Sequence, residues 1–236
     1  MNLTYRLIFT IIAFLTFSFG VEAQPIFGFQ TGINVSALSG SKSYDENKLR
    51  LGINGYVFTD IQLGHNSIVS LETGLSFSQQ GMNHVKIIKE IGSSTKLKIY
   101  NKLNYLVIPI YLKENYSQFY TKIGPYGAYL LSAESKWKSE KTIANVKKPE
   151  TEGIDEEFAD KVNKYDLGLS FGFGFVHYFD PHTYRKRRGK KQTPVVQVDF
   201  KYNLGLMAID PTKNIPDMNL RNHVFTIGLS ITAVKN

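Results

Sequence analysis

The sequence has no cysteine among its 236 residues. That absence excludes disulfides, thiolate zinc sites, a cysteine nucleophile and a lipid anchor attached to cysteine. Tryptophan is almost missing as well, with a single residue against 14 Tyr and 16 Phe. Beyond the first 20 residues the chain also lacks any predominantly apolar run that approaches the ~18 residues of a membrane-spanning helix. A helical membrane protein is therefore excluded for the rest of the chain.

The residues that are plentiful favour β structure. Hydrophobic residues make up 42% of the chain, yet the mean hydropathy is only −0.19. The aromatic residues and 19 glycines are typical of strands with amphipathic ring positions and close backbone contacts. The length fits one domain. The formal net charge of +8 is compatible with binding to nucleic acid or to an anionic membrane surface. The cellular compartment of the protein determines which of these two partners it can meet.

The N-terminal segment has the order of a secretory signal peptide. A short region with one positive charge, residues 1–6, precedes a nearly apolar run at residues 7–20. Val21 and Ala23 then offer small or modest side chains at the −3 and −1 positions of a cleavage site. We predict that residues 1–23 are a cleaved signal peptide and that residues 24–236 form one barrel domain. The alternative is a buried N-terminal helix. Export removes nucleic acid from the expected partners.

The mature chain alternates apolar residues with polar or small ones every two positions, in eight stretches. They are residues 27–36, 49–57, 69–78, 105–112, 118–131, 166–175, 196–204 and 224–232. A period of two excludes helices, and stretches of about ten residues suit tilted transmembrane strands. In lipid only helices and closed barrels satisfy every backbone group. We therefore predict an all-β fold, an eight-stranded antiparallel up-and-down transmembrane β-barrel.

The strands of a soluble sandwich or barrel would also alternate apolar and polar residues. The composition of the two faces therefore distinguishes a soluble fold from a transmembrane barrel. The non-apolar face is mostly Gly, Ser and Asn with scattered charges, which is typical of a narrow polar lumen. The alternative is a soluble periplasmic lipocalin-like barrel that binds a lipid-like ligand. That barrel would need an apolar interior and a polar exterior, the inverse of this pattern.

Two segments resemble the third and fourth strands of the PorT-like porin family, outer-membrane β-barrel proteins of Gram-negative bacteria. They are SLETGLSFSQQG at residues 70–81 and NYLVIPIYLK at residues 104–113. Residues 123–127, 166–168 and 202–206 are similar to later strands of that family. The resemblance implies an outer-membrane location, and some relatives serve protein secretion and gliding motility. The chain departs from the usual pattern of such barrels at its end, which carries no terminal aromatic residue.

An even number of strands predicts that both termini lie on the periplasmic side. The extracellular loops are then expected at residues 37–48, 79–100, 132–164 and 207–221. The periplasmic turns are expected at residues 59–67, 114–118 and 180–193. The extracellular set is mostly the longer one, and its loop at 132–164 is highly charged and contains Trp137.

Strand parity predicts charged side chains inside the barrel. The residues are Arg50, Glu72, Lys122, Asp166, Asp199 and Lys201. Side chains just fill an eight-stranded barrel, and a lone buried charge costs several kcal/mol. We therefore expect an ion-pair network that plugs the lumen, with Glu72 paired to Arg50 or Lys122. The alternative is a narrow conductance pathway, whereas a wide aqueous pore takes roughly 16 strands.

Six basic residues crowd into the predicted periplasmic turn between the sixth and seventh strands. They are Arg185, Lys186, Arg187, Arg188, Lys190 and Lys191. One interpretation is contact with anionic inner-leaflet headgroups or with an acidic periplasmic partner. The other is a solvated turn kept mobile by its own repulsion.

Patterns of catalysis or metal binding are weak in this chain. His177 and His182 are five residues apart around a strand end, without carboxylates that would complete a metal shell. Gly168, Gly172 and Gly174 lie within a strand, without the following helix that a phosphate loop requires. No nucleophile elbow is present. We expect a monomeric outer-membrane barrel surrounded by lipid, without enzymatic activity or cofactor, that serves limited transport or a structural and partner-binding role through its loops.

Overall fold

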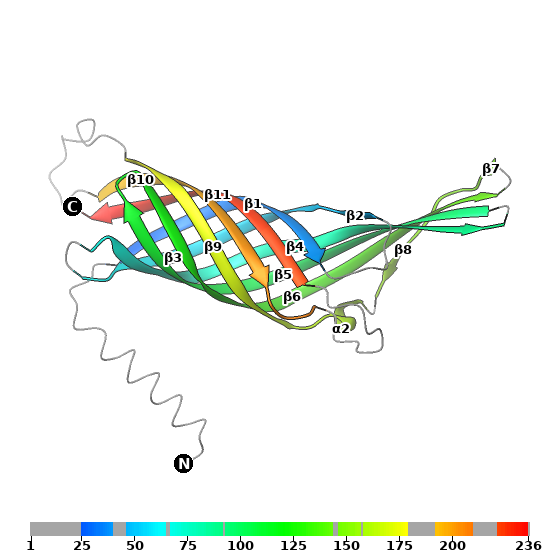
Figure 1. Ribbon diagram of the computed structural model, residues 1–236, viewed down its shortest axis with the longest axis horizontal. Helices are drawn as coiled ribbons and strands as arrows, with labels where there is room; N and C mark the ends of the chain where they lie inside the picture. The colour runs from blue at the N-terminus through cyan, green and yellow to red at the C-terminus, as the bar shows by residue number, and fades with distance from the viewer. Residues whose placement is uncertain are drawn as a thin grey trace, which may run out of the picture.

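The computed structural model describes residues 25–39, 46–64, 67–91, 93–143, 146–156, 158–178, 192–209 and 221–235. Eight long strands carry the fold (Figure 1). They are β1 (Ile26–Ser39), β3 (Arg50–Gln62), β4 (Val69–Glu90), β5 (Ser93–Tyr116), β6 (Phe119–Ile143), β9 (Tyr165–Tyr178), β10 (Gln192–Gly205) and β11 (Arg221–Lys235). Four short elements accompany them: β2 (Glu46–Lys48), β7 (Val146–Lys147), β8 (Thr151–Asp155) and helix α2 (Phe158–Lys161). The predicted signal peptide lies outside the described residues, and none of the described helices is long and apolar enough to span a membrane.

The eight long strands form a closed ring in chain order. Each strand pairs antiparallel with its neighbours in the order β4-β3-β1-β11-β10-β9-β6-β5, and the pairing of β4 with β5 completes the circle. The first and last strands meet along their length, with Gly28 opposite Thr232 and Ile33 opposite Ile227. Every predicted stretch coincides with one of these strands. The predicted eight-stranded antiparallel up-and-down barrel is therefore confirmed.

The barrel has its apolar side chains outside and its polar ones inside. On β9, Leu167, Phe171 and Phe175 are 54%, 42% and 56% exposed, whereas Ser170 between them is fully buried. The same alternation runs around the ring, so the outer surface is a contiguous apolar belt. A soluble protein rarely exposes such a surface, whereas lipid covers it without cost. The soluble lipocalin-like alternative requires the opposite arrangement and is wrong.

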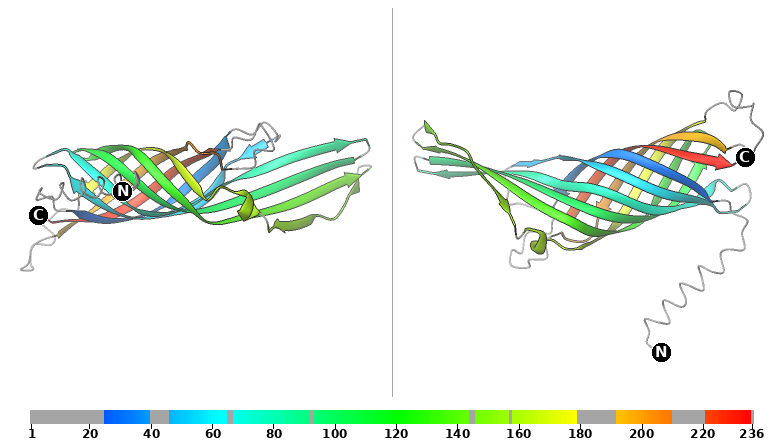
Figure 2. Two further views of the ribbon diagram at one scale, coloured as in Figure 1. Left: turned by 90° about the horizontal axis from the view of Figure 1, so that it is seen from below. Right: turned by 180° about the vertical axis from the view of Figure 1, so that it is seen from behind.

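Three strands continue well beyond the barrel and form a projecting sheet. β4 and β5 stay paired out to Glu90 and Ser93, and β6 follows β5 as far as Ile143. β7 and β8 pair with the outer part of β6. We call this sheet the arm: residues 82–90, 93–103 and 133–143 together with β7 and β8. It extends far past the other strands in every view (Figures 1 and 2).

The arm corrects the prediction that residues 79–100 and 132–164 are loops. The sequence suggested that strands end where lysines replace the apolar residues. Charged residues can nevertheless alternate with apolar ones outside the membrane, as Lys96 and Lys98 do with Leu97 and Ile99, and such a strand satisfies its backbone by pairing. β4 and β6 therefore end later than predicted, and β5 begins earlier.

The short turns lie at the end of the barrel opposite the arm. Ile26 at the start of β1 pairs with Asp60 near the end of β3, and Val69 pairs with Glu114. The predicted turns at 59–67 and 114–118 belong to this end, although β3 continues to Gln62 and β5 to Tyr116. β11 also finishes there, so we call it the terminal end.

Candidate functional site in the barrel lumen

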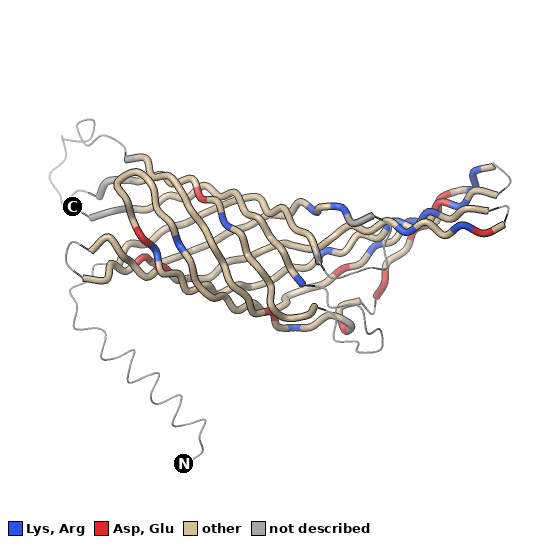
Figure 3. The backbone as a smooth tube through the Cα atoms, viewed as in Figure 1, with Lys and Arg blue, Asp and Glu red and all other residues tan. Residues whose placement is uncertain are grey.

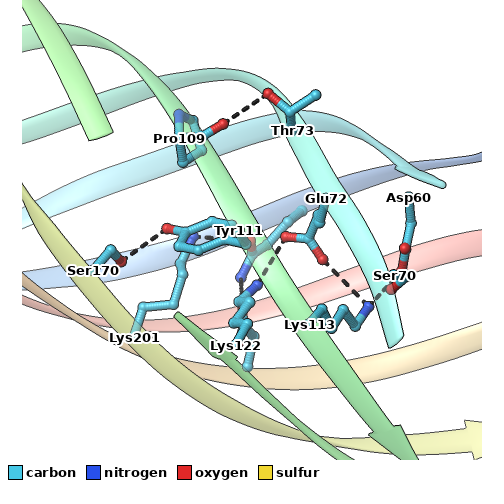
Figure 4. Close-up of polar contacts among 12 residues, drawn as sticks. Asp60, Ser70, Glu72, Thr73, Pro109, Tyr111, Lys113, Lys122, Ser170 and Lys201 are labelled. Atoms are coloured by element: carbon cyan, nitrogen blue, oxygen red, sulfur yellow. Dashed lines mark hydrogen bonds and ion pairs between the residues drawn. The ribbon is translucent and has the colours of Figure 1, made fainter. Parts of the chain in front are cut away.

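A chain of ion pairs crosses the lumen near the terminal end (Figure 4). Lys113 Nζ lies 2.8 Å from Asp60 Oδ2 and 3.3 Å from Glu72 Oε2. Lys122 Nζ lies 3.0 Å from Glu72 Oε1 and 2.8 Å from Asp199 Oδ2. The five residues come from β3, β4, β5, β6 and β10, and all of these contacts except Lys113–Glu72 join strands that are not neighbours in the ring.

Gln30 on β1 extends this chain to a third lysine. Its Nε2 donates to Asp199 Oδ2 at 3.1 Å, and its Oε1 accepts from Lys201 Nζ at 3.2 Å. The set then contains three carboxylates and three ammonium groups, which balance in charge. We call it the charge network: Asp60, Glu72, Lys113, Lys122, Asp199 and Lys201, with Gln30.

Tyrosine rings pack against the ammonium groups and fill the space around them. Lys113 Nζ lies 4.3 Å from the centroid of the Tyr120 ring, and Lys122 Nζ lies 5.0 Å from that of Tyr111. Lys201 Nζ lies 4.9 Å from the Tyr56 centroid. The negative face of an aromatic ring attracts a cation, so these rings stabilise the lysines while they exclude water.

Two glycines on β9 explain how β6 reaches β10 across the lumen. A Cβ on Gly172 would lie 3.2 Å from the Lys122 side chain, and one on Gly174 would lie 2.4 Å from the Tyr120 ring. Bare glycine backbone therefore lets both side chains pass over β9. The spacing that superficially suggests a phosphate loop serves close packing in a strand.

The network is deeply buried. Glu72 and Lys113 are each 1% exposed, and Lys122 is 4% exposed. Glu72, Lys113 and Lys122 are tolerated because each has a partner of opposite sign. Removal of one partner would leave the other charge buried and unpaired, at a cost of about 3–5 kcal/mol. The buried ion pairs therefore tie five strands of the barrel together.

The six charges predicted to face inward fall into three groups in the structure: the members of the charge network, Asp166, and Arg50. Glu72, Lys122, Asp199 and Lys201 come together in the charge network. Asp166 is also buried but lies apart, where its Oδ2 accepts from Asn222 Nδ2 at 2.9 Å and from the Tyr126 hydroxyl at 3.3 Å.

Of the two partners expected for Glu72, Lys122 makes the ion pair and Arg50 does not. Arg50 is half-exposed at the opposite end of β3 from Asp60, ten residues away or about 33 Å along the strand. The described partners of Glu72 are Lys113 and Lys122. Parity placed Arg50 on the correct face of β3, but depth along the barrel decides which charges can meet.

Two members of the network, Asp60 and Lys113, were missed in the sequence. Both keep the inward parity of their strands, since Asp60 follows Tyr56 by four residues and Lys113 follows Tyr111 by two. The predicted stretches on β3 and β5, the second and fourth of the long strands, ended at residues 57 and 112, before these charges. Continuing the alternation of residues 49–57 and 105–112 into the adjoining charged residues would have found both.

A polar layer fills the middle of the barrel. Asn34 Nδ2 donates to Ser78 Oγ at 2.9 Å, and Asn34 Oδ1 accepts from Thr226 Oγ1 at 2.7 Å. Asn54 Nδ2 donates to Ser76 Oγ at 2.9 Å. These short side chains come from four strands and bond to one another across the interior.

An apolar cluster, which we call the cap, lies toward the arm end of the barrel. We define the cap as the buried cluster of Met82, Leu103, Tyr105, Val107, Tyr126, Ala128, Leu130, Val162 and Ile209. Two segments outside the ring, residues 158–164 and 206–209, hold it in place. The amide of Asn163 donates to the Ile209 carbonyl at 2.7 Å, and that of Leu130 donates to the Lys164 carbonyl at 2.8 Å. The barrel interior is thus occupied at three successive levels.

Two other expectations from the sequence concern basic residues and metals. The basic segment Arg185, Lys186, Arg187, Arg188, Lys190 and Lys191 lies outside the described residues. Within the part of the chain that the structure describes, no three His, Cys, Asp or Glu side chains gather as a metal site would require.

A family model described as the outer membrane protein β-barrel domain matches residues 23–210. The chain belongs to this family. Membership places the barrel in the outer membrane, which agrees with its apolar exterior. The matched range ends before β11, although β11 pairs with both β1 and β10 to close the ring.

Among solved structures, this outer-membrane barrel is similar to Ail, the attachment invasion locus protein of Yersinia pestis, at 12% identity, a TM-score of 0.36, and coverage of 89% of this chain and 99% of that one. Neisserial surface protein A is similar at 9% identity and a TM-score of 0.36, with coverage of 87% and 96%. OprG from Pseudomonas aeruginosa is similar at 13% identity and a TM-score of 0.30, with coverage of 90% and 97%. No curated protein matches the chain.

Proposed function

We propose that this protein is a closed, non-enzymatic outer-membrane barrel that anchors the arm outside the cell and does not conduct solutes. The observation that carries the proposal is the filling of the lumen. The charge network, the polar layer and the apolar cap follow one another from the terminal end to the arm end. A conducting path would need water along the whole axis, and an eight-stranded barrel leaves little room beside its side chains.

Limited transport is the other role that the sequence left open. The charge network favours the closed barrel because its carboxylates and lysines neutralise one another at short range. An ion that entered would have to displace buried partners, each held by a charge of opposite sign. The cap adds an apolar barrier behind them.

The arm is the element through which such an anchor would act. It contains most of the structure outside the ring, and we place it on the extracellular side because long loops of outer-membrane barrels face outward while short turns face the periplasm. The barrel would act as a monomer in contact with lipid, without a nucleic-acid partner. The basic segment at 185–191 would then face the periplasm and contact anionic headgroups or an acidic partner there.

A relation to the PorT-like porin type is the finer family proposal. Its support is that residues 70–81 and 104–113, which carry the resemblance, lie on β4 and β5 and pair with each other, with Ser70 opposite Lys113. The same two strands continue into the arm. The resemblance therefore covers the part of the barrel from which the arm grows.

Conductance in planar lipid bilayers tests the closed lumen. The wild-type protein should give no steady current, whereas the double variant Tyr111→Ala/Tyr120→Ala should show openings because two rings that pack on the network are removed. Leu75→Ala, which shortens a side chain on the outer surface, is the matched control and should stay silent. Steady current through the wild type would overturn the proposal in favour of limited transport.

A further inference from the structure

Asp166, near the start of β9, is a buried carboxylate that lies outside the charge network. Charged residues crowd along the arm, whereas the barrel strands carry few of them (Figure 3). Asp166 is 2% exposed, and among the described residues it takes part in no ion pair. The carboxylates of the charge network have lysines beside them, but nothing in the described part of the chain balances the charge of Asp166.

The hydrogen-bond partners of Asp166 are neutral side chains. Its Oδ2 accepts from Asn222 Nδ2 at 2.9 Å and from the Tyr126 hydroxyl at 3.3 Å. These donors orient the carboxylate, but they bring no positive charge. A buried charge without a partner of opposite sign is strongly unfavourable, so the charge of Asp166 calls for compensation.

Three oxygen atoms around this carboxylate lack a hydrogen-bond partner in the described structure. They are Asp166 Oδ1, Asn222 Oδ1 and the Tyr105 hydroxyl. The Tyr105 hydroxyl lies next to the Asn222 side chain, outside hydrogen-bond geometry, and both residues are 1% exposed. Buried polar atoms without partners are uncommon in proteins, and each one asks for an explanation. Here three such atoms coincide with an uncompensated charge.

Two glycines bring these side chains together from separate strands. Gly205 on β10 pairs with Gly168 on β9, which in turn stands opposite Tyr126 on β6. A Cβ on Gly205 would lie 3.2 Å from the Cβ of Asn222, and one on Gly168 would lie 2.5 Å from the Tyr126 ring. Bare backbone therefore leaves room for Asn222 of β11 and Tyr126 of β6 to reach Asp166.

A water molecule, a proton and a metal cation differ in how much of this site they complete. Water can donate to Asp166 Oδ1 and Asn222 Oδ1 and accept from Tyr105, but it leaves the negative charge uncompensated. A proton on Asp166 removes the charge and can be shared with Asn222 Oδ1, but it leaves the Tyr105 hydroxyl without a partner. A hard cation binds oxygen ligands, so it balances the charge and engages all three oxygens at once.

The number of carboxylates sets the charge of this cation. One carboxylate neutralises one positive charge, whereas a divalent ion would leave a net charge buried in the barrel. The described residues also hold no cluster of three His, Cys, Asp or Glu side chains, which a transition metal would favour.

We propose that Asp166, Asn222 and Tyr105 bind a sodium ion. The ion joins β9, β11 and β5 beside the cap, at the end of the barrel from which the arm projects. The proposal goes beyond the closed anchor and does not depend on whether the barrel conducts.

The test measures the urea unfolding of the full-length protein in detergent micelles while sodium chloride replaces choline chloride at constant ionic strength. Choline is too large for a buried site and serves as the inert cation. Asp166→Asn removes the charge and keeps the shape of the side chain. Asp160→Asn is the matched control, because Asp160 is an exposed residue of α2 at the same end of the barrel.

The unfolding equilibrium constant of the wild type should fall about tenfold for each tenfold rise in sodium concentration above half-saturation, because the ion binds the folded state alone. Asp160→Asn should respond as the wild type does, and Asp166→Asn should not respond. If Asp166→Asn does not fold, Asn222→Ser removes one oxygen ligand and keeps the carboxylate. That variant should need a higher sodium concentration for half of the effect.

Equal stability of the wild type in sodium and choline chloride would overturn the proposal, and would mean that a proton or a water molecule completes the site. A sodium response that persists in Asp166→Asn, or that is unchanged in Asn222→Ser, would also overturn it, since the ion would then bind elsewhere.

Discussion

Glu72 is the residue on which the charge network depends most, since it touches two lysines from two strands. Glu72→Leu should lower the free energy of unfolding by about 3–5 kcal/mol, because Lys113 and Lys122 stay buried with one carboxylate fewer. Urea unfolding in detergent micelles, followed by the gel shift of the folded barrel, measures this loss. Lys113→Met added to Glu72→Leu should restore part of it. A loss below about 1 kcal/mol would mean that water reaches the stranded lysines.

At the scale of single residues, the sequence predicted which charges face inward but not which ones meet. Period two places Glu72, Lys122, Asp199 and Lys201 inside, whatever the register. The contact between Lys122 and Asp199 depends on β6 and β10 flanking β9 and on the glycines that let a side chain cross it. Relative depth is set by the stagger of the strands, which no local pattern contains.

β4 offers a test of membrane depth within one strand. Leu75 is 53% exposed midway between Val69, where β4 begins, and the arm, whereas Leu71 lies only two residues from that start. Leu75→Arg should cost about 2–4 kcal/mol of folding free energy in a bilayer, and Leu71→Arg about 0–1 kcal/mol. Equilibrium folding into vesicles gives both values. Equal costs for the two variants would contradict the assigned position of the belt.

The arm has its own packing test at Trp137, the only tryptophan of the chain. Gly153 on β8 stands opposite Trp137, and a Cβ there would lie 2.6 Å from its ring. Gly153→Leu should displace the ring, shift its fluorescence to the red and increase quenching by acrylamide. Gly55→Ala on β3, where a Cβ meets open space, is the control and should leave the spectrum unchanged. An unchanged spectrum in Gly153→Leu would mean that β8 is not held against β6.

At the scale of elements, the eight barrel strands were predictable and the arm was not. A strand in lipid must present apolar residues at every second position, so residues 166–175 and 224–232 can be recognised as strands from the sequence. A strand in water does not need apolar residues at alternate positions. Residues 83–90 pair with 93–100 through their backbones, and the lysines among them resemble the lysines of any solvated loop.

The whole molecule combines a filled barrel with a sheet that only three of its long strands build. β4, β5 and β6 are adjacent in the ring, so their extension leaves the arm rooted on one side of the barrel mouth. The charge network supports this root, because displacement of β4, β5 or β6 would break buried ion pairs with other strands. The central claim is therefore that an outer-membrane barrel holds the arm outside the cell.

Cysteine labelling in intact cells tests this claim most directly, because the natural chain has no cysteine. Ile91→Cys places a thiol at the tip of the β4–β5 hairpin, where Ile91 is fully exposed, and Gln118→Cys places one in the exposed turn between β5 and β6. A membrane-impermeant maleimide should label Ile91→Cys in intact cells and should label Gln118→Cys only after the outer membrane is permeabilised. Gly189→Cys, in the predicted periplasmic turn, should behave like Gln118→Cys. Labelling of Gln118→Cys in intact cells, with Ile91→Cys protected, would contradict the account.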